Sequence, residues 1–230
     1  IAMFNPNVFI FSSNLNFSFT SILSKLGFDY SQENPPVNST PIETIPKYSS
    51  TKPNYLNIDM ENSDKLKIEE SIKKYADEIN ILELSTPIEF IVVDLQNNPV
   101  SFADFNTKAG FDIPSYIITQ LESNFSLFIY NDNKISKLGL VIPTKNTPSL
   151  KESLMLAEKT LTESLKPLFL SQEITPNDKP FNDSTYSESA IRYKNLSAEL
   201  SVDYSIINDK LAIGSSKMTL RAIIDYQNKK

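Results

Sequence analysis

Apolar residues recur at helical spacing between about residue 63 and residue 82, which predicts an amphipathic helix capped by Asn62 or Ser63. The opposite face carries Glu and Lys spaced four residues apart, which suits a solvent-facing side. The positions expected to face the core are Ile68, Ile72, Tyr75, Ile79 and Leu82.

Alternating or β-branched apolar runs predict strands before and after this helix. The clearest are a run at 88–95, turned by residues 96–99, and a hairpin that joins 124–130 to 135–142. Further strands are expected at 55–60, 190–196, 200–207 and 210–214.

Capping residues predict the remaining helices. Ser101 and Asp104 form a capping box before a short helix closed by Gly110, and Pro114 suits the first turn of another. A long helix is expected from 147 to about 166, and a last helix from 215 or 216 to 228. The polar, proline-containing stretch 171–188 reads as a surface loop.

This order of elements predicts the α+β class, with a mainly antiparallel sheet and amphipathic helices on one face. A strand–strand–helix unit occurs at 124–166 and again at 200–228, which suggests an internal duplication.

Composition divides the chain into three parts. Residues 1–30 are β-prone and carry no charge before Lys25, residues 31–53 contain five prolines, and residues 54–230 form the globular domain. The proline-rich part is expected to be an extended tether. The alternating residues Leu15, Phe17 and Phe19 predict a strand that folds back onto its own sheet, is exchanged with another chain, or belongs to a membrane-proximal stalk.

The missing residue types exclude several kinds of chemistry. The chain has no His and no Cys, so it contains no His-based catalytic triad, thiol nucleophile, disulfide or thiolate metal site. Four Gly leave little for a glycine-rich phosphate loop. We therefore expect no metal, no cofactor and no catalytic residue.

The charge balance argues against nucleic acid as a partner, because 22 basic and 28 acidic residues give a net charge of −6. No apolar run approaches the ~20 residues of a membrane helix. The chain begins with Ile, so we expect any contact with a membrane to depend on a segment missing from this sequence.

Two further combinations of residues could supply catalytic groups. Ser71 and Lys74 have Ser-x-x-Lys spacing but lie inside a predicted helix, and Ser216 with Lys217 reads as a helix cap followed by a solvated amine. The carboxylates Asp104, Asp183, Glu199 and Asp203 lie near element ends, but their spacing singles out no acid–base pair.

Arg192 is one of only two arginines and lies inside a predicted strand, on the same face as Lys194. Because guanidinium groups bind carboxylates in a bidentate manner, we expect a structural ion pair, with Asp203 on the adjacent strand as the partner.

The stretches 190–196 and 200–217 resemble a family of uncharacterised membrane-anchored envelope proteins from candidate-phylum bacteria with reduced genomes. The likeness lies in a strand, a turn, a second strand and a Gly-Ser-Ser-Lys run before a terminal helix, and it extends loosely over residues 46–227. It implies an extracytoplasmic domain held at the cell surface, and it implies no catalytic residue.

Together these features predict a non-enzymatic structural or protein-interaction domain of the cell envelope, whose partner is a second copy of itself or another envelope component. The alternative is a hydrolase or ligand-binding module that uses Ser/Lys or carboxylate groups. A cleft with buried, converging polar groups would favour the alternative, and flat apolar patches at a sheet edge would favour the interaction domain.

Overall fold

The computed structural model describes residues 47–82, 84, 86–174 and 177–229, which belong to one compact unit spanning Pro46–Lys230. The expected N-terminal strand with Leu15, Phe17 and Phe19 lies outside the described residues.

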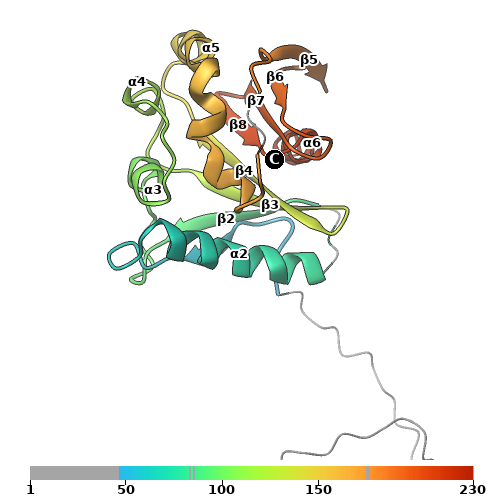
Figure 1. The fold of residues 1–230 in the computed structure, drawn as a ribbon. Helices are drawn as coiled ribbons and strands as arrows, with labels where there is room; N and C mark the ends of the chain where they lie inside the picture. Colours follow the sequence, from blue (N-terminus) through green and yellow to red (C-terminus); the bar gives the residue numbers. More distant parts are fainter. Residues whose placement is uncertain (1–46, 83, 85, 175–176, 230) are drawn as a thin grey trace, which may run out of the picture. The chain divides into compact units, whose positions relative to one another are not determined.

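The unit is built on an eight-stranded sheet of order β1-β2-β3-β4-β8-β7-β6-β5, which confirms the α+β class (Figure 1). Every neighbouring pair is antiparallel except β1 and β2, which run parallel. The strands are β1 (Asn54–Asn57), β2 (Ile88–Val93), β3 (Ser126–Asp132), β4 (Ile135–Pro143), β5 (Asn182–Tyr186), β6 (Ser189–Asn195), β7 (Ser201–Ile207) and β8 (Lys210–Gly214).

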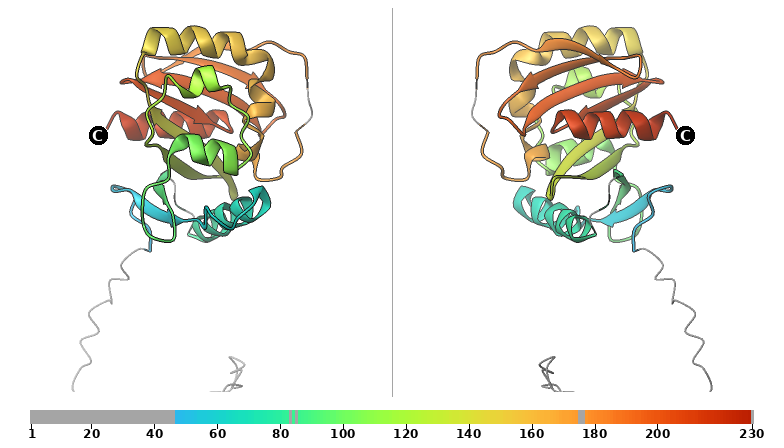
Figure 2. Two further views of the ribbon diagram at one scale, coloured as in Figure 1. Left: turned by 90° about the vertical axis from the view of Figure 1, so that its left-hand side faces the viewer. Right: turned by 90° about the vertical axis from the view of Figure 1, so that its right-hand side faces the viewer.

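Helices cover both faces of this sheet, not one face as predicted. The larger core lies on the side of α2 (Lys65–Ile81), α3 (Phe102–Lys108), α4 (Ser115–Ile118), α5 (Thr147–Ser164) and the 3₁₀ turn η1 (Lys166–Phe169). The terminal helix α6 (Lys217–Gln227) packs on the opposite face, and Figures 1 and 2 show α5 and α6 on opposite sides of the strands. Alternation along β3 explains the division, because Leu127 and Ile129 face the larger core whereas Phe128 between them faces α6.

The two strand–strand–helix units are therefore not equivalent in space. Both β3–β4–α5 and β7–β8–α6 are present, but their helices pack on different faces.

Side-chain caps fix the helix starts. Ser101 accepts a hydrogen bond from the backbone of Asp104, as the capping box predicts, and Ser216 caps α6. Helix α2 begins one or two residues later than expected, because Asp64 is its cap instead of Asn62 or Ser63.

Three hairpins share one type of tight turn. Each loop has two residues with positive φ, the conformation that matches the twist of the paired strands: Asn133 and Lys134, Ser187 and Glu188, and Asn208 and Asp209. The middle hairpin forms β5, which lies within the stretch predicted to be a loop. That prediction was wrong because β5 is a polar edge strand without apolar alternation.

The folded unit begins before the expected boundary at residue 54. Tyr48 is 6% exposed, and its ring packs edge-on against Phe90 with centroids 5.6 Å apart. Glu78 on α2 accepts hydrogen bonds from the Tyr48 hydroxyl and the Lys47 ammonium. Residues 47–53 are therefore part of the domain, although the proline-rich composition of residues 31–53 predicted a tether.

Two glycines make room for α6 on the sheet. Gly139 and Gly214 are directly opposite each other on β4 and β8. A Cβ atom at Gly214 would lie 2.7 Å from the backbone nitrogen of Leu220, and one at Gly139 would overlap the Cδ1 atom of Ile223 on α6. The helix can approach this closely only because both positions lack a side chain.

Candidate functional site

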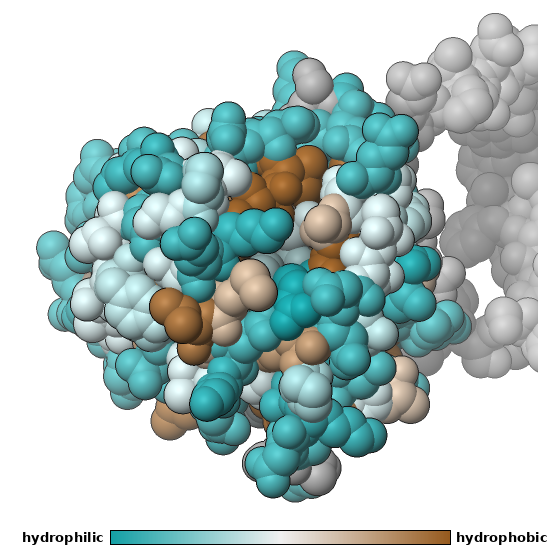
Figure 3. All heavy atoms as spheres, turned by 90° about the horizontal axis from the view of Figure 1, so that it is seen from above, coloured by the Kyte–Doolittle hydropathy of each residue, from teal (hydrophilic) through white to brown (hydrophobic). Residues whose placement is uncertain are grey.

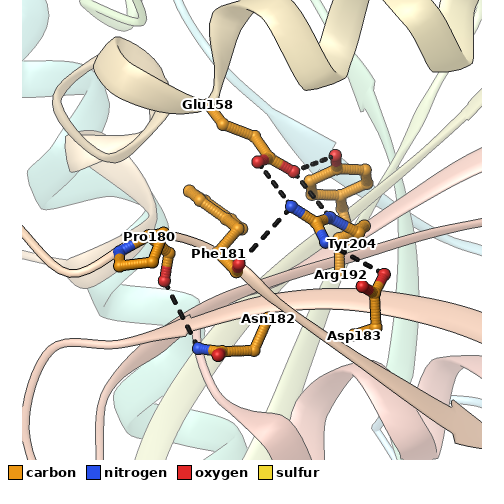
Figure 4. A network of polar contacts seen from close by, with 7 residues as sticks. All are labelled: Glu158, Pro180, Phe181, Asn182, Asp183, Arg192 and Tyr204. Carbon is orange, nitrogen blue, oxygen red and sulfur yellow. Dashed lines mark hydrogen bonds and ion pairs between the residues drawn. The ribbon is translucent and has the colours of Figure 1, made fainter.

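The strand arginine forms an ion pair with a helix. The Nε and Nη2 atoms of Arg192 on β6 donate to the two carboxylate oxygens of Glu158 on α5, at 2.7 and 2.6 Å (Figure 4). The Nη1 atom lies 2.9 Å from Asp183 on β5. Arg192 therefore has the carboxylate partner that the sequence predicted, but not the residue expected.

Asp203 is not that partner. Along β6 and β7, Tyr193 lies opposite Asp203 and Arg192 lies opposite Tyr204. Because side chains alternate across a sheet, Arg192 points to the α5 face and Asp203 to the α6 face. The pairing of Arg192 with Asp203 is therefore wrong, since adjacency of two strands does not place their side chains on one face.

The same carboxylate also accepts the Tyr204 hydroxyl at 2.7 Å, and Arg192 contacts the carbonyl oxygen of Phe181 at 3.5 Å. The carboxylate of Glu158 raises the pKa of the Arg192 guanidinium, and burial together with Glu158 raises the pKa of the Tyr204 hydroxyl. This network ties α5 to three neighbouring strands and holds Phe181 in place.

A groove of about 680 Å³ lies beside this network, between α5 and residues 177–181. Asn177 fixes the second wall by donating to the carbonyl oxygen of Asn195, at 3.0 Å. Other residues that line the groove are Met155, Leu156, Lys159, Lys179, Pro180 and Lys194. We call this feature the α5 groove.

Lys194 is the unusual member of the α5 groove. Only 8% of the residue is exposed, yet its ammonium group has no hydrogen bond or ion pair with any residue that the structure describes. A Lys with a buried stem normally keeps its ammonium end in water, so an anion bound in the groove could pair with it.

A second, smaller cavity lies on the opposite face, between α6 and strands β5–β7. Its volume is about 190 Å³, and Asp203 lines it while remaining only 2% exposed. The Ser201 hydroxyl donates to the Asp203 carboxylate, and burial raises the pKa of Asp203 to about 6. We call it the Asp203 cavity.

The helix side of the Asp203 cavity carries two cations, Lys217 and Arg221, one turn apart on α6. Neither forms an ion pair with a described residue. The Arg221 guanidinium lies 4.7 Å from the centre of the Tyr186 ring, and its Nε atom is buried without a hydrogen-bond partner in the described part of the chain. The strand side of the cavity includes Tyr193 and Asn195.

A neighbouring hollow of about 280 Å³ contains Lys137, which is 2% exposed. Its ammonium donates to Gln172 at 3.0 Å, and desolvation lowers its pKa. Ser216 and Lys217 line the same hollow, so buried polar groups converge around the start of α6.

The other candidates have structural roles. Ser71 donates back to the carbonyl oxygen of Lys67 within α2, and Ser216 accepts from the backbone of Thr219 as the cap of α6. Asp104 bonds to Ser101 in the capping box. Among the described residues, no group of three or more carboxylates is arranged to hold a metal ion.

Sequence reasoning missed Glu158, which follows the buried Leu154 by four residues and precedes the buried Leu161 by three. An acid at that spacing is directed toward the inner side of the helix, and this is the feature that could have identified it. Lys137 could have been found as a charge inside a predicted strand, and Lys194 shares the predicted strand face of Arg192 but had no predicted role.

Comparisons with known proteins found no matching family model, no matching curated protein and no matching solved structure. Within the described residues, none of the helices combines the length and the apolar character needed to span a bilayer.

Proposed function

We propose that this protein is a non-enzymatic interaction domain of the cell envelope, which binds an acidic segment of a partner protein in the α5 groove. The observation that carries the proposal is Lys194, whose stem is buried and whose ammonium lines that groove without a hydrogen bond or ion pair to any described residue. The envelope location rests on the resemblance of residues 190–217.

Apolar side chains at the rim give the groove a second binding element. Leu156 is 79% exposed and Met155 is 50% exposed, on the helix wall of the groove. Figure 3 shows the surface seen from above Figure 1, with small brown areas among teal side chains. A partner segment would cover this apolar surface, and such anchors contribute much of the affinity of an interface.

The charges define the class of partner. Lys159, Lys179 and Lys194 line the groove, whereas Glu158 is already neutralised by Arg192 and only Asp178 opposes them. An acidic segment with an apolar side chain next to its carboxylates matches both elements. The walls are held by the Arg192 network and by Asn177, so little ordering is needed on binding.

A fluorescence anisotropy titration tests the proposal. The probe is a short labelled peptide rich in Glu with one central Leu, compared with a peptide in which Lys replaces every Glu. We expect the acidic peptide to bind, and Lys194→Gln and Leu156→Ser each to weaken binding about tenfold, equivalent to about 1.4 kcal/mol.

Ile81→Ser is the matched control, because Ile81 is 80% exposed on α2, away from the groove. Equal binding of both peptides, or an equal loss in the Ile81 and Leu156 variants, would refute the groove as the binding surface.

The Asp203 cavity favours a second candidate, a carboxylate-based hydrolase. Asp203 has a pKa of about 6 and contacts a serine hydroxyl, which suits a general base near neutral pH. Hydrolysis of a simple activated ester by the native protein, abolished in Asp203→Asn, would support this candidate. The same residual rate in both proteins would exclude it.

A further inference from the structure

The function proposed for the α5 groove assigns no role to the Asp203 cavity. It lies on the opposite face of the sheet, and opposite charges line its two sides. We infer that this cavity binds a small zwitterion, a free α-amino acid, between Asp203 and the α6 cations Lys217 and Arg221. The inference does not depend on the α5 groove.

The buried carboxylate supplies one half of the recognition. Asp203 receives only the Ser201 hydroxyl among described groups, so it retains acceptor capacity on the cavity side. An ammonium group placed there would compensate a buried negative charge that neither Lys217 nor Arg221 contacts directly.

The two α6 side chains supply the other half. They are one helical turn apart and therefore lie on the same side of the helix. Arg221 is held against the Tyr186 ring, which orients its planar group, and its guanidinium forms no ion pair with a described residue. A carboxylate is the group that such a donor binds best.

The size of the cavity limits the ligand. A volume of about 190 Å³ corresponds to about six water molecules, at ~30 Å³ each in the liquid. Sites for larger organic ligands usually measure about 300–1,000 Å³. An amino acid with a small side chain fits, and Tyr193 and Ile191 give it a partly apolar wall.

The experiment is an NMR titration of the whole protein with alanine, tested separately as the L and D forms. Propionate and ethylamine each carry only one of its two charged groups and serve as the comparison ligands. We expect saturable shifts of the backbone amides of β6, β7 and the first turn of α6 with at least one form of alanine. Each comparison ligand should bind at least about tenfold more weakly, because one of the two charged walls is then left unpaired.

Three variants complete the test. Asp203→Asn and Arg221→Gln should each weaken alanine binding about tenfold or more, whereas Lys73→Gln, on the exposed side of α2, should leave it unchanged. If Arg221→Gln fails to fold, Lys217→Gln replaces it, because Lys217 is exposed.

The inference would be overturned if about 10 mM alanine produced no localised shifts, because the dissociation constant would then be weaker than that of specific binding. Equal binding of propionate and alanine would also overturn it, since it would show a simple anion site. Binding that Asp203→Asn leaves intact would have the same consequence.

Discussion

Replacing Arg192 with alanine removes the only cation that contacts the Glu158 carboxylate among the described residues. The Glu158 side chain is 14% exposed and that of Arg192 is 21% exposed, so water can solvate the stranded carboxylate only in part. Afterwards Glu158 would keep one hydrogen-bond partner among the described residues, the Tyr204 hydroxyl at 2.7 Å. Breaking a buried ion pair typically costs 3–5 kcal/mol, and with this residual exposure we expect about 2–4 kcal/mol for Arg192→Ala.

Urea unfolding followed by circular dichroism measures this loss. For a domain of this size, it corresponds to a fall in the melting temperature of roughly 5–15 °C. Asp183→Asn is the matched control, because it removes the charge of the second carboxylate that contacts Arg192. Its side chain is 87% exposed, so the expected cost is below about 1 kcal/mol.

A double-mutant cycle with Glu158→Gln isolates the pair. If the two groups act together, their coupling energy should lie within about 0.5–3 kcal/mol. An unchanged unfolding midpoint in Arg192→Ala, or an equal loss in Asp183→Asn, would refute the reasoning that burial of Glu158 determines the cost.

Three further changes test other parts of the fold. Between the unfolded pKa of 3.8 and the folded pKa of about 6, the folded protein holds a proton on Asp203 that the unfolded chain releases. The contribution of this group to stability is therefore present at low pH and is lost as pH rises through 6. The total loss is about 3 kcal/mol in the free energy of unfolding. Urea unfolding at about pH 4 and about pH 7 should therefore show that Asp203→Asn gains stability over the native protein only at the higher pH, and a constant difference would contradict this. Gly214→Ala should destabilise by about 1–3 kcal/mol in thermal melts, because its Cβ would press on the α6 backbone, and an unchanged melting temperature would show that the helix moves freely. Leu161→Ala, at a position 1% exposed, should cost about 2–5 kcal/mol in urea unfolding, with a single transition, and two transitions would show that the domain is divided.

Local patterns predicted most of the fold because their causes are local. The spacing of Ile68, Ile72 and Ile79 requires a helix with one buried face, and the residues around Asn133 and Asn208 favour the tight turns that join the hairpins. β5 escaped prediction because an edge strand gains its hydrogen bonds from one neighbour and needs no apolar side chains.

Long-range placement was not predictable in the same way. The choice of face for α6 depends on Phe128, Gly139 and Gly214, which are far apart in sequence and become neighbours only in the finished sheet. The partner of Arg192 depended on the same choice of faces, so the prediction of Asp203 failed although the need for a carboxylate was correct.

The two faces of the sheet differ in how their buried charges are paired. The α5 face holds the larger apolar core, and its buried charges Arg192 and Glu158 neutralise each other. The α6 face has a smaller apolar cluster, and its buried Asp203 has no cation in direct contact within the described part of the chain. Charges that stabilise a fold are normally paired within it, whereas an unpaired buried charge reduces stability and is retained where it meets a ligand. By this criterion binding should be sought at Asp203. The ammonium of Lys194, which lines the α5 groove without a described partner, is a further position, whereas Arg192, the residue that stood out in the sequence, pairs with Glu158 and stabilises the fold.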